Sequence, residues 1–176
     1  MTICPHCGFV NIEGADTCEQ CGHSLADVED QKPATEVERA LLRDQVGVLH
    51  PKACITVGPD ARIRDVLRLL VERDIGCVVI AEDGKIQGIF SERDALMKLN
   101  VRALELGDEP VRRFMTAQPQ TLTAVDKVAF AVHRMDLGSY RHVPIVEDDS
   151  NVTGIISARD IFGYLTEKMR IAKRGS

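Results

Sequence analysis

The chain has 176 residues, of which 44% are apolar and 28% charged, a balance typical of a soluble globular protein with one or two compact domains. Its net charge of −5, with no Trp, two Tyr and five Phe, argues against a basic surface for duplex nucleic acid and against broad stacking platforms for single strands. No apolar run approaches the roughly 18–20 residues of a membrane span, and the N-terminus lacks a secretory pattern, so we expect a cytoplasmic protein without a membrane partner.

Four of the six cysteines form two close pairs near the N-terminus. Cys4 and Cys7 make the first Cys-x-x-Cys pair, Cys18 and Cys21 make the second, and a glycine follows each pair. Disulfides are disfavoured in the cytoplasm, and a thioredoxin-like redox site uses a single pair within a βαβ pattern that this segment lacks. Two such pairs can place four thiolates tetrahedrally around one Zn²⁺. We therefore predict a structural zinc site with no coordination position left open for catalysis.

The segment from Cys4 to Leu25 resembles the small zinc ribbons appended to many bacterial and archaeal proteins, and we assign residues 1–26 to such a ribbon. A segment of about 20 residues cannot bury enough apolar surface to fold alone, so metal binding is expected to supply its folding free energy. Residues 1–30 contain six acidic side chains and no Lys or Arg, which disfavours contact with phosphates. We expect a ribbon that is purely structural or that docks an unidentified protein partner.

A linker and a short helix are predicted to follow the ribbon over residues 27–46. The part from Asp27 to Thr35 is polar, includes Pro33 and has no apolar period, which is typical of a linker. Residues 36–46 place their apolar side chains on one side of a helix. This helix is expected to pack on the domain that follows.

From about residue 47 the chain repeats itself at an offset of 65 or 66 residues. The run from Gly88 to Asp94 (GIFSERD) matches the run from Gly154 to Asp160 (GIISARD). Each copy predicts a short strand, an amphipathic helix, two strands around an acidic turn, and a last helix. The predicted ranges are 54–57, 63–70, 76–81, 85–90 and 92–99 in the first copy, and 120–122, 125–132, 142–146, 152–156 and 158–169 in the second. Each β-α-β-β-α unit of about 60 residues is marginal alone, so the two should pack together.

These runs resemble the two members of a cystathionine-β-synthase (CBS) domain pair, or Bateman module. The resemblance is carried by residues 75–80 and 84–94 in the first copy, and by 114–116, 141–146 and 154–160 in the second. It implies an α/β fold with a first repeat at residues 47–107 and a second repeat at 108–176. It also implies a cleft for AMP, ADP, ATP or another adenosyl ligand, and association into a homodimer. Residues 48–51 depart from the Met-Thr pattern that Met115 and Thr116 keep.

The resemblance also assigns candidate ligand-binding residues at two places: the corner between the last strand and the last helix of each repeat, and the start of the strand at residues 142–146 in the second repeat. By resemblance, Asp would accept hydrogen bonds from the ribose hydroxyls and Ser would contact ribose or phosphate. The arginine one residue before each Asp carries a charge that could neutralise the phosphate in bidentate fashion. The candidates are Ser91, Arg93 and Asp94 in the first repeat, and Arg141, His142, Val143, Pro144, Ser157, Arg159 and Asp160 in the second. A Ser-x-x-Asp pattern before a helix is also a capping box, which explains the same residues without a ligand. His142 is equally explained as a partly buried histidine at a strand edge.

No catalytic constellation accompanies these motifs, so we expect a non-enzymatic regulatory module that senses an adenine nucleotide. The alternative is a zinc-ribbon regulator that binds nucleic acid or acts in transcription, which the acidic N-terminus disfavours. The sequence leaves open which adenosyl ligand is preferred, whether one or both clefts bind it, which protein is regulated and whether the ribbon only supports the fold.

Overall fold

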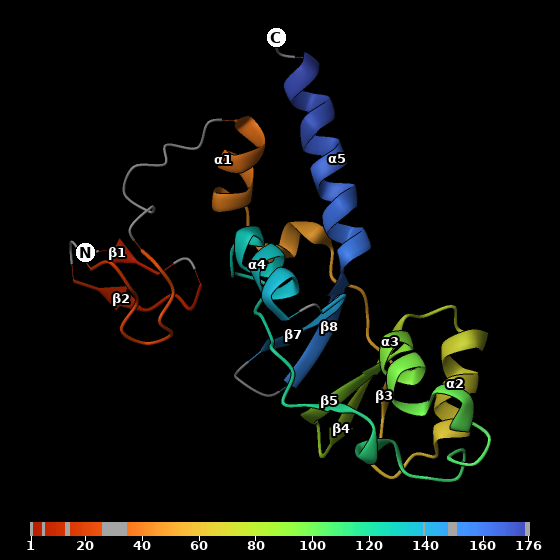
Figure 1. The fold of residues 1–176 in the computed structure, drawn as a ribbon. Coiled ribbons are helices and arrows are strands. Elements are labelled where there is room, and N and C mark those ends of the chain that lie inside the picture. The colour runs from red at the N-terminus through yellow and green to blue at the C-terminus, as the bar shows by residue number, and fades with distance from the viewer. Residues whose placement is uncertain are drawn as a thin grey trace. The chain divides into compact units, whose positions relative to one another are not determined.

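The computed structural model in Figure 1 describes residues 2–4, 6–12, 15–25, 35–138, 140–147 and 151–174. Most of the predicted linker (residues 27–34) and most of the acidic turn of the second repeat (residues 148–150) lie outside the described residues. The chain divides into two units, each built from separate stretches of sequence. One contains Met1–Leu49, Val125–Arg141 and Ala158–Ser176, and the other contains His50–Ala124 and His142–Ser157. We call them the helical unit and the sheet unit.

The N-terminal segment of the helical unit folds around its two cysteine pairs. Strand β1 (Thr2–Ile3) pairs antiparallel with β2 (Val10–Asn11). The N–H of Gly8 donates to the Cys4 carbonyl at 3.0 Å, and the N–H of Gly22 donates to the Cys18 carbonyl at 2.8 Å. Both glycines have left-handed backbones, with φ of 73° and 70°, which glycine adopts without the penalty of a Cβ. The equivalent turns bring both pairs back toward the same point.

Three helices form the rest of the helical unit: α1 (Glu36–Arg43), α4 (Val128–Gly138) and α5 (Ala158–Arg174). Helix α1 begins at a capping box, in which the Glu38 N–H donates to Thr35 Oγ1 and the Thr35 N–H donates to the Glu38 carboxylate. It ends at Arg43, earlier than predicted, because Asp44 is extended (ψ 144°) and a 3₁₀ turn follows at Val46–Leu49. Helix α5 is longer than its predicted range of 158–169.

The prediction that helix α4 begins at Val125 is wrong. Residues 125–127 are instead held against the segment that leaves α1, through a bridge between Gln45 and Lys127. The Val46 N–H donates to the Asp126 carbonyl at 2.7 Å, and the Val128 N–H donates to the Asp44 carbonyl at 2.9 Å. Backbone groups used in this pairing cannot also close helical turns, so the helix starts at Val128. Val125 is accordingly 67% exposed.

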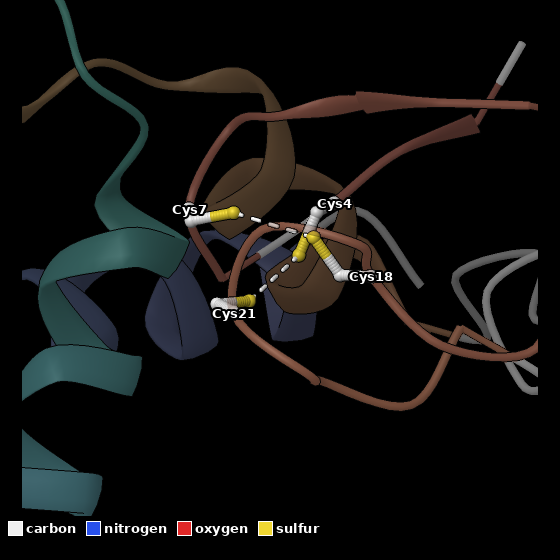
Figure 2. Close-up of side chains that lie close together, drawn as sticks. All are labelled: Cys4, Cys7, Cys18 and Cys21. Carbon is white, nitrogen blue, oxygen red and sulfur yellow. Dashed lines mark hydrogen bonds between the residues drawn. The ribbon is translucent and has the colours of Figure 1, made fainter.

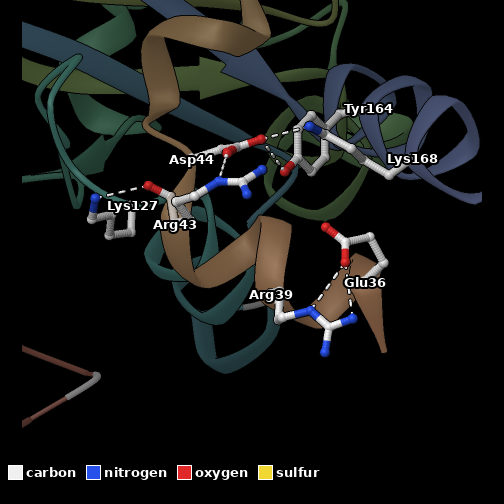
Figure 3. A network of polar contacts seen from close by, with 7 residues as sticks. All are labelled: Glu36, Arg39, Arg43, Asp44, Lys127, Tyr164 and Lys168. Carbon is white, nitrogen blue, oxygen red and sulfur yellow. Dashed lines mark hydrogen bonds and ion pairs between the residues drawn. The ribbon is translucent and has the colours of Figure 1, made fainter. Parts of the chain in front are cut away.

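Asp44 connects the three helices of this unit (Figure 3). Its carboxylate accepts hydrogen bonds from Lys168 Nζ at 2.6 Å, Tyr164 Oη at 3.0 Å and Arg43 Nε at 3.0 Å. Lys127 Nζ adds a bond of 2.8 Å to the Arg43 carbonyl. The bond from Lys168, with those from Arg43 and Tyr164, outweighs burial and lowers the pKa of Asp44 to about 2. We call Asp44 with Arg43, Tyr164 and Lys168 the Asp44 hub.

The sheet unit contains one six-stranded sheet in the order β3-β4-β5-β8-β7, with β6 also pairing with β5. The strands are β3 (Thr56–Val57), β4 (Cys77–Glu82), β5 (Lys85–Ser91), β6 (Thr116–Ala117), β7 (His142–Glu147) and β8 (Asn151–Ser157). The β4–β5 and β7–β8 hairpins share one register, which pairs Cys77 with Ser91 and His142 with Ser157. Their bulges follow Ile80 and Ile145, so the structure confirms the internal repeat.

The first strand of the second repeat, predicted at residues 120–122, does not form. Leu122 makes a single parallel bridge to Ile145, whereas β3 pairs with β4 over two residues. The difference between the repeats arises in the partner strand. In the first repeat the Val79 N–H donates to the Ile55 carbonyl at 2.9 Å. Pro144 stands at the position equivalent to Val79 and has no N–H to donate. One ladder bond is therefore lost, and the strand is reduced to a bridge.

The core of the first repeat joins helix α2 (Ile63–Glu72) to the β4–β5 hairpin. Its eight buried residues are Ile63, Val66, Leu70, Val78, Ile80, Phe90, Leu99 and Val111. The last helix of the repeat, predicted at 92–99, consists of one α-turn, α3 (Glu92–Asp94), followed by a π-helical turn at Ala95–Leu99. Among the described residues, no helix is both long and apolar enough to cross a membrane.

Candidate functional site

The four N-terminal cysteines converge on one point (Figure 2). Their sulfur atoms all lie within 4.8 Å of one another, and no other group of three or more His, Cys, Asp or Glu residues in the described part of the chain does so. The Sγ–Sγ distances are 3.7 Å for Cys4 and Cys21 and 3.5 Å for Cys7 and Cys18. Tetrahedral Zn–S bonds of about 2.3 Å place sulfurs about 3.8 Å apart. The predicted ligands therefore fit a tetrahedral zinc site.

The surroundings of the cysteines also suit a cation. The buried amide of Asn11 donates to Cys18 Sγ at 3.6 Å, and the Glu19 N–H holds the Asn11 carbonyl oxygen at 3.0 Å. Burial acts to raise the pKa of Cys18, but N–H donors lower it to about 6, while burial and the other sulfurs raise the pKa of Cys21 to about 12. Four adjacent sulfurs cannot all ionise without a positive charge between them. A divalent cation at their centre removes this conflict.

Three histidines meet beside the cysteine cluster. His6 lies within the first cysteine pair and His23 follows the second, and their rings lie 4.6 and 5.1 Å from the ring of His133 on helix α4. Burial lowers the pKa of His133, and so do the neighbouring charges of His6 and His23. Sequence reasoning missed His133. A lone histidine in an otherwise apolar helix gives no signal that it contacts a segment more than a hundred residues away.

In the first repeat, the structure brings Ser91 and Asp94 together at the corner where β5 meets α3. The Ser91 N–H and Oγ donate to Asp94 Oδ2 at 2.9 and 2.6 Å. The Asp94 N–H returns a bond of 3.3 Å to Ser91 Oγ, which completes a capping box. Burial opposes ionisation of Asp94, but the bonds from Lys98 and Ser91 lower its pKa. The third candidate, Arg93, is exposed.

Two further residues contact Asp94 that the sequence analysis did not single out. Thr116 Oγ1 donates to Asp94 Oδ1 at 3.0 Å, and Lys98 Nζ lies 2.7 Å from the same oxygen. Thr116 belongs to the Met-Thr pattern quoted above, but its contact joins residues 22 positions apart. The only sequence signal for Lys98 is its spacing of four residues from Asp94, which places both on one side of a helix.

In the second repeat, Ser157 ends β8 opposite His142, as Ser91 ends β5 opposite Cys77. The Ala158 N–H donates to the Arg141 carbonyl at 2.9 Å, as the Glu92 N–H donates to Gly76 at 3.0 Å in the first repeat. The remaining candidates lie as follows: Arg141 and Arg159 are exposed, Asp160 is half-buried in the first turn of α5, and Val143 and Pro144 are buried in β7. The side chains of Val143 and Pro144 are therefore not available to a ligand, and the Pro144 carbonyl already accepts from the Leu122 N–H at 3.1 Å.

The His142 imidazole packs against the first repeat. A Cβ placed on Gly76 would lie 2.7 Å from His142 Cε1 and 2.8 Å from Nε2. Contacts as short as these are excluded, so the glycine provides the space that the imidazole fills. His142 is half-buried at the start of β7, as expected for a histidine at a strand edge.

Known proteins match the repeats. A sequence model of the CBS domain family matches residues 46–100 and 111–167, well over half of the chain. An uncharacterized 17.7 kDa protein of Acidianus ambivalens is 30% identical over 106 residues, or 60% of this chain and 63% of that protein. The match to the CBS domain-containing protein CBSCBSPB1 of Arabidopsis thaliana, 26% identical, spans 58% of this chain and 19% of that protein. The chain therefore spans less than two thirds of the length of these relatives.

Solved structures show the same fold. A CBS-domain protein of Agrobacterium tumefaciens has a TM-score of 0.63 and 29% identity, covering 68% of this chain and 98% of its own. A CBS domain protein of Pyrobaculum aerophilum complexed with AMP has a TM-score of 0.59 and 24% identity, covering 70% of this chain and 98% of its own. The ranges matched by the family model include both hairpins and both strand-to-helix corners. From its repeats, its fold and these matches, the chain belongs to the CBS domain family.

Proposed function

We propose that this chain is a non-enzymatic regulatory module in which the CBS pair binds an adenine nucleotide and the N-terminal segment forms a structural zinc ribbon. The observation that carries the proposal is the repeated corner, in which Gly-x-x-Ser-x-x-Asp joins strand to helix at Gly88–Asp94 and again at Gly154–Asp160. The AMP complex of the Pyrobaculum relative supports adenine nucleotides as the ligand class. The proposed domains are 1–26 (ribbon), 27–46 (linker and helix), 47–107 and 108–176 (repeats).

The chemistry of the corner suits a nucleotide. An ionised Asp accepts hydrogen bonds only, so Asp94 and Asp160 are suited to the two hydroxyl groups of a ribose. Arg93 and Arg159 carry the charge that a phosphate requires and can bind it in bidentate fashion. Ser91 and Ser157 offer hydroxyls to ribose or phosphate, and the backbone around Val143 and Ile145, on either side of Pro144, is the proposed contact for adenine. Arg141 and His142 complete the proposed set in the second repeat.

Ligand binding would act by shifting a population of conformations. A nucleotide that contacts both repeats favours the arrangement to which it binds best, and a protein partner that recognises this arrangement senses the ligand. The coupling is reciprocal, so the partner must change nucleotide affinity by the same factor as the nucleotide changes partner affinity. The proposal places the module in the cytoplasm, where thiols stay reduced.

Zinc held by Cys4, Cys7, Cys18 and Cys21 would stabilise the ribbon, because a closed four-thiolate shell has no position for substrate. The alternative function, in which the ribbon binds nucleic acid, is not supported by the charge of this segment, because residues 1–30 contain no Lys or Arg. We therefore propose a structural role for the ribbon, and docking of a protein partner as its second role.

We also propose a homodimer. Leu96 and Phe162 occupy equivalent positions in the last helices of the two repeats, and they are 73% and 66% exposed. Large apolar side chains exposed at repeated positions suit a partner with the same repeated surface, which is a second copy of the chain. A sedimentation experiment that shows only monomer at micromolar concentration would contradict this part of the proposal.

The nucleotide proposal is tested by thermal unfolding with a panel of AMP, ADP, ATP, NAD(H) and S-adenosylmethionine. A ligand that binds only the folded protein stabilises it by about 2.7 kcal/mol at a hundred times its dissociation constant. We expect at least one member of the panel to raise the Tm. The rise should disappear in a double variant, Asp94→Asn with Asp160→Asn, that still unfolds cooperatively. A panel without any effect would leave the corners as helix caps only.

A further inference from the structure

The Asp94 carboxylate has no acceptor capacity left. A carboxylate offers about four lone-pair positions. Oδ2 accepts from the Ser91 N–H and Oγ, while Oδ1 accepts from Thr116 Oγ1 and from Lys98 Nζ. The Asp94 side chain is only 12% exposed. A ribose diol, which needs two acceptors, can reach this carboxylate only if two of the present donors leave.

The Lys98 ammonium likewise has partners for all three of its N–H groups. Its three N–H groups meet Asp94 Oδ1 at 2.7 Å, the Phe114 carbonyl at 2.7 Å and Thr116 Oγ1 at 3.3 Å. Phe114 and Thr116 belong to the segment that begins the second repeat, and Thr116 lies in β6, paired with β5. Lys98 therefore ties the ligand corner of the first repeat to the start of the second repeat. We call this set of three bonds the Lys98 bridge.

The residue equivalent to Lys98 in the second repeat is Tyr164, 66 positions later. Its hydroxyl donates to Asp44 Oδ2 at 3.0 Å, as part of the Asp44 hub. The side chain at position 164 therefore serves the helical unit and carries no ammonium group. The lysine is a feature of the first repeat and is not demanded by the repeated fold.

We infer that the Lys98 bridge holds the first ligand corner closed, and that a nucleotide binding there must open the bridge and release the start of the second repeat. This inference rests on the proposed nucleotide binding. The exchange is balanced, because two ribose hydroxyls replace the Lys98 N–H and the Thr116 O–H on Oδ1. Loss of both bonds detaches Lys98 and Thr116 from Asp94, so the start of the second repeat loses its side-chain tie to the corner. Binding at the first corner is thereby coupled to the segment between the repeats.

Two measurements on the full chain test the inference, and the first requires no ligand. Hydrogen exchange of the backbone amides from Met115 to Gln118 is compared between wild type and Lys98→Met. We expect these amides to exchange faster in the variant, because β6 loses its side-chain tie to the corner. Lys173→Met removes the same charge from an exposed position in α5 and should leave the exchange unchanged. Equal exchange in wild type and Lys98→Met would overturn the inference.

The second measurement is calorimetric titration with AMP in an Asp160→Asn background, in which binding reports the first corner. Lys98→Met should bind AMP roughly three- to tenfold more tightly, because one charged donor no longer competes for Asp94. Unchanged or weaker affinity would show that Lys98 does not close the corner. Hydrogen exchange could rise as expected while AMP binds neither to the Asp160→Asn protein nor to its Lys98→Met variant. This result would contradict the proposed nucleotide binding but support the structural tie made by Lys98. If Lys98→Met does not fold, Thr116→Val, which removes the other donor to Oδ1, serves in both assays.

Discussion

The proposed N-terminal ribbon and the first repeat have cores of very different size. Among the described residues, the ribbon's hydrophobic cluster buries Cys4, Cys18 and Leu25, and two of these three are ligands of the proposed metal. The core around α2 and the β4–β5 hairpin buries eight apolar side chains, seven of them from the first repeat. We expect a segment with so small a core to depend on an ion, and a repeat with a full core to depend on the packing of its side chains. The two regions should therefore respond to different perturbations.

The largest expected effect is removal of the metal. Structural zinc contributes about 10–16 kcal/mol of apparent binding free energy in small zinc modules near pH 7. Cys18→Ala, or a strong chelator, should therefore unfold residues 2–25 and leave the sheet of the repeats intact. Hydrogen exchange measured segment by segment reports both the unfolding of residues 2–25 and the persistence of the sheet. Cys54→Ala removes a thiol outside the cluster and should leave the ribbon folded. Loss of the whole fold on chelation would show that the two regions do not fold independently.

The next largest effect concerns the hydrophobic core of the first repeat. Phe90 is fully buried in the core of the first repeat, and its truncation to Ala should cost about 3–5 kcal/mol. Denaturant unfolding should show this loss for the repeats, while the ribbon keeps its zinc as read by a colorimetric metal assay. Release of zinc by Phe90→Ala under conditions where the protein is folded would make the ribbon dependent on the repeat.

A smaller effect concerns the Asp44 hub, which joins α1 to α5 in the helical unit. Folding lowers the pKa of Asp44 from 3.8 to about 2, so ionised Asp44 stabilises the folded state by about 2 kcal/mol. The contribution is fully present above pH 3.8 and is lost as the pH falls through 2. Asp44→Asn should therefore be less stable than wild type at pH 6, and the difference should shrink toward pH 2.

The matched control for Asp44 is Asp83→Asn, an exposed turn residue whose positive φ of 50° suits Asn. Urea midpoints of the three proteins between pH 2 and pH 7 provide the measurement. A difference between Asp44→Asn and wild type that stays constant with pH would mean that the lost contribution is not electrostatic.

The sequence predicted the repeated hairpins because local patterns determine them. Runs rich in β-branched residues on both sides of an acidic turn indicate the strands, and the shared motifs place Ser91 and Ser157 at equivalent strand ends. The cysteine spacing likewise predicted a converging set of sulfurs. Boundaries were predicted less well where pairing with a distant segment competes with local preference. Val125 follows a helical pattern, yet pairing of Gln45 with Lys127 delays the start of α4.

The contacts around Asp94 show what sequence patterns leave out. Ser91 and Asp94 are three residues apart, so their capping box was visible in the sequence. Thr116 reaches the same carboxylate from another strand, and Lys98 also bonds to the Phe114 carbonyl. The meeting of these groups depends on how β6 pairs with β5, which no local pattern encodes. His133 was missed for the same reason.

The repeated corner, as a receptor for the ribose of an adenine nucleotide, is the feature on which the proposed function depends most. Isothermal titration calorimetry of AMP into the full chain, compared with the Asp94→Asn/Asp160→Asn variant, tests this directly. We predict saturable binding to the wild type and at least tenfold weaker binding to the variant, because a neutral amide is a poorer acceptor than a carboxylate. Equal affinity in the two proteins, with both still folded, would contradict the account.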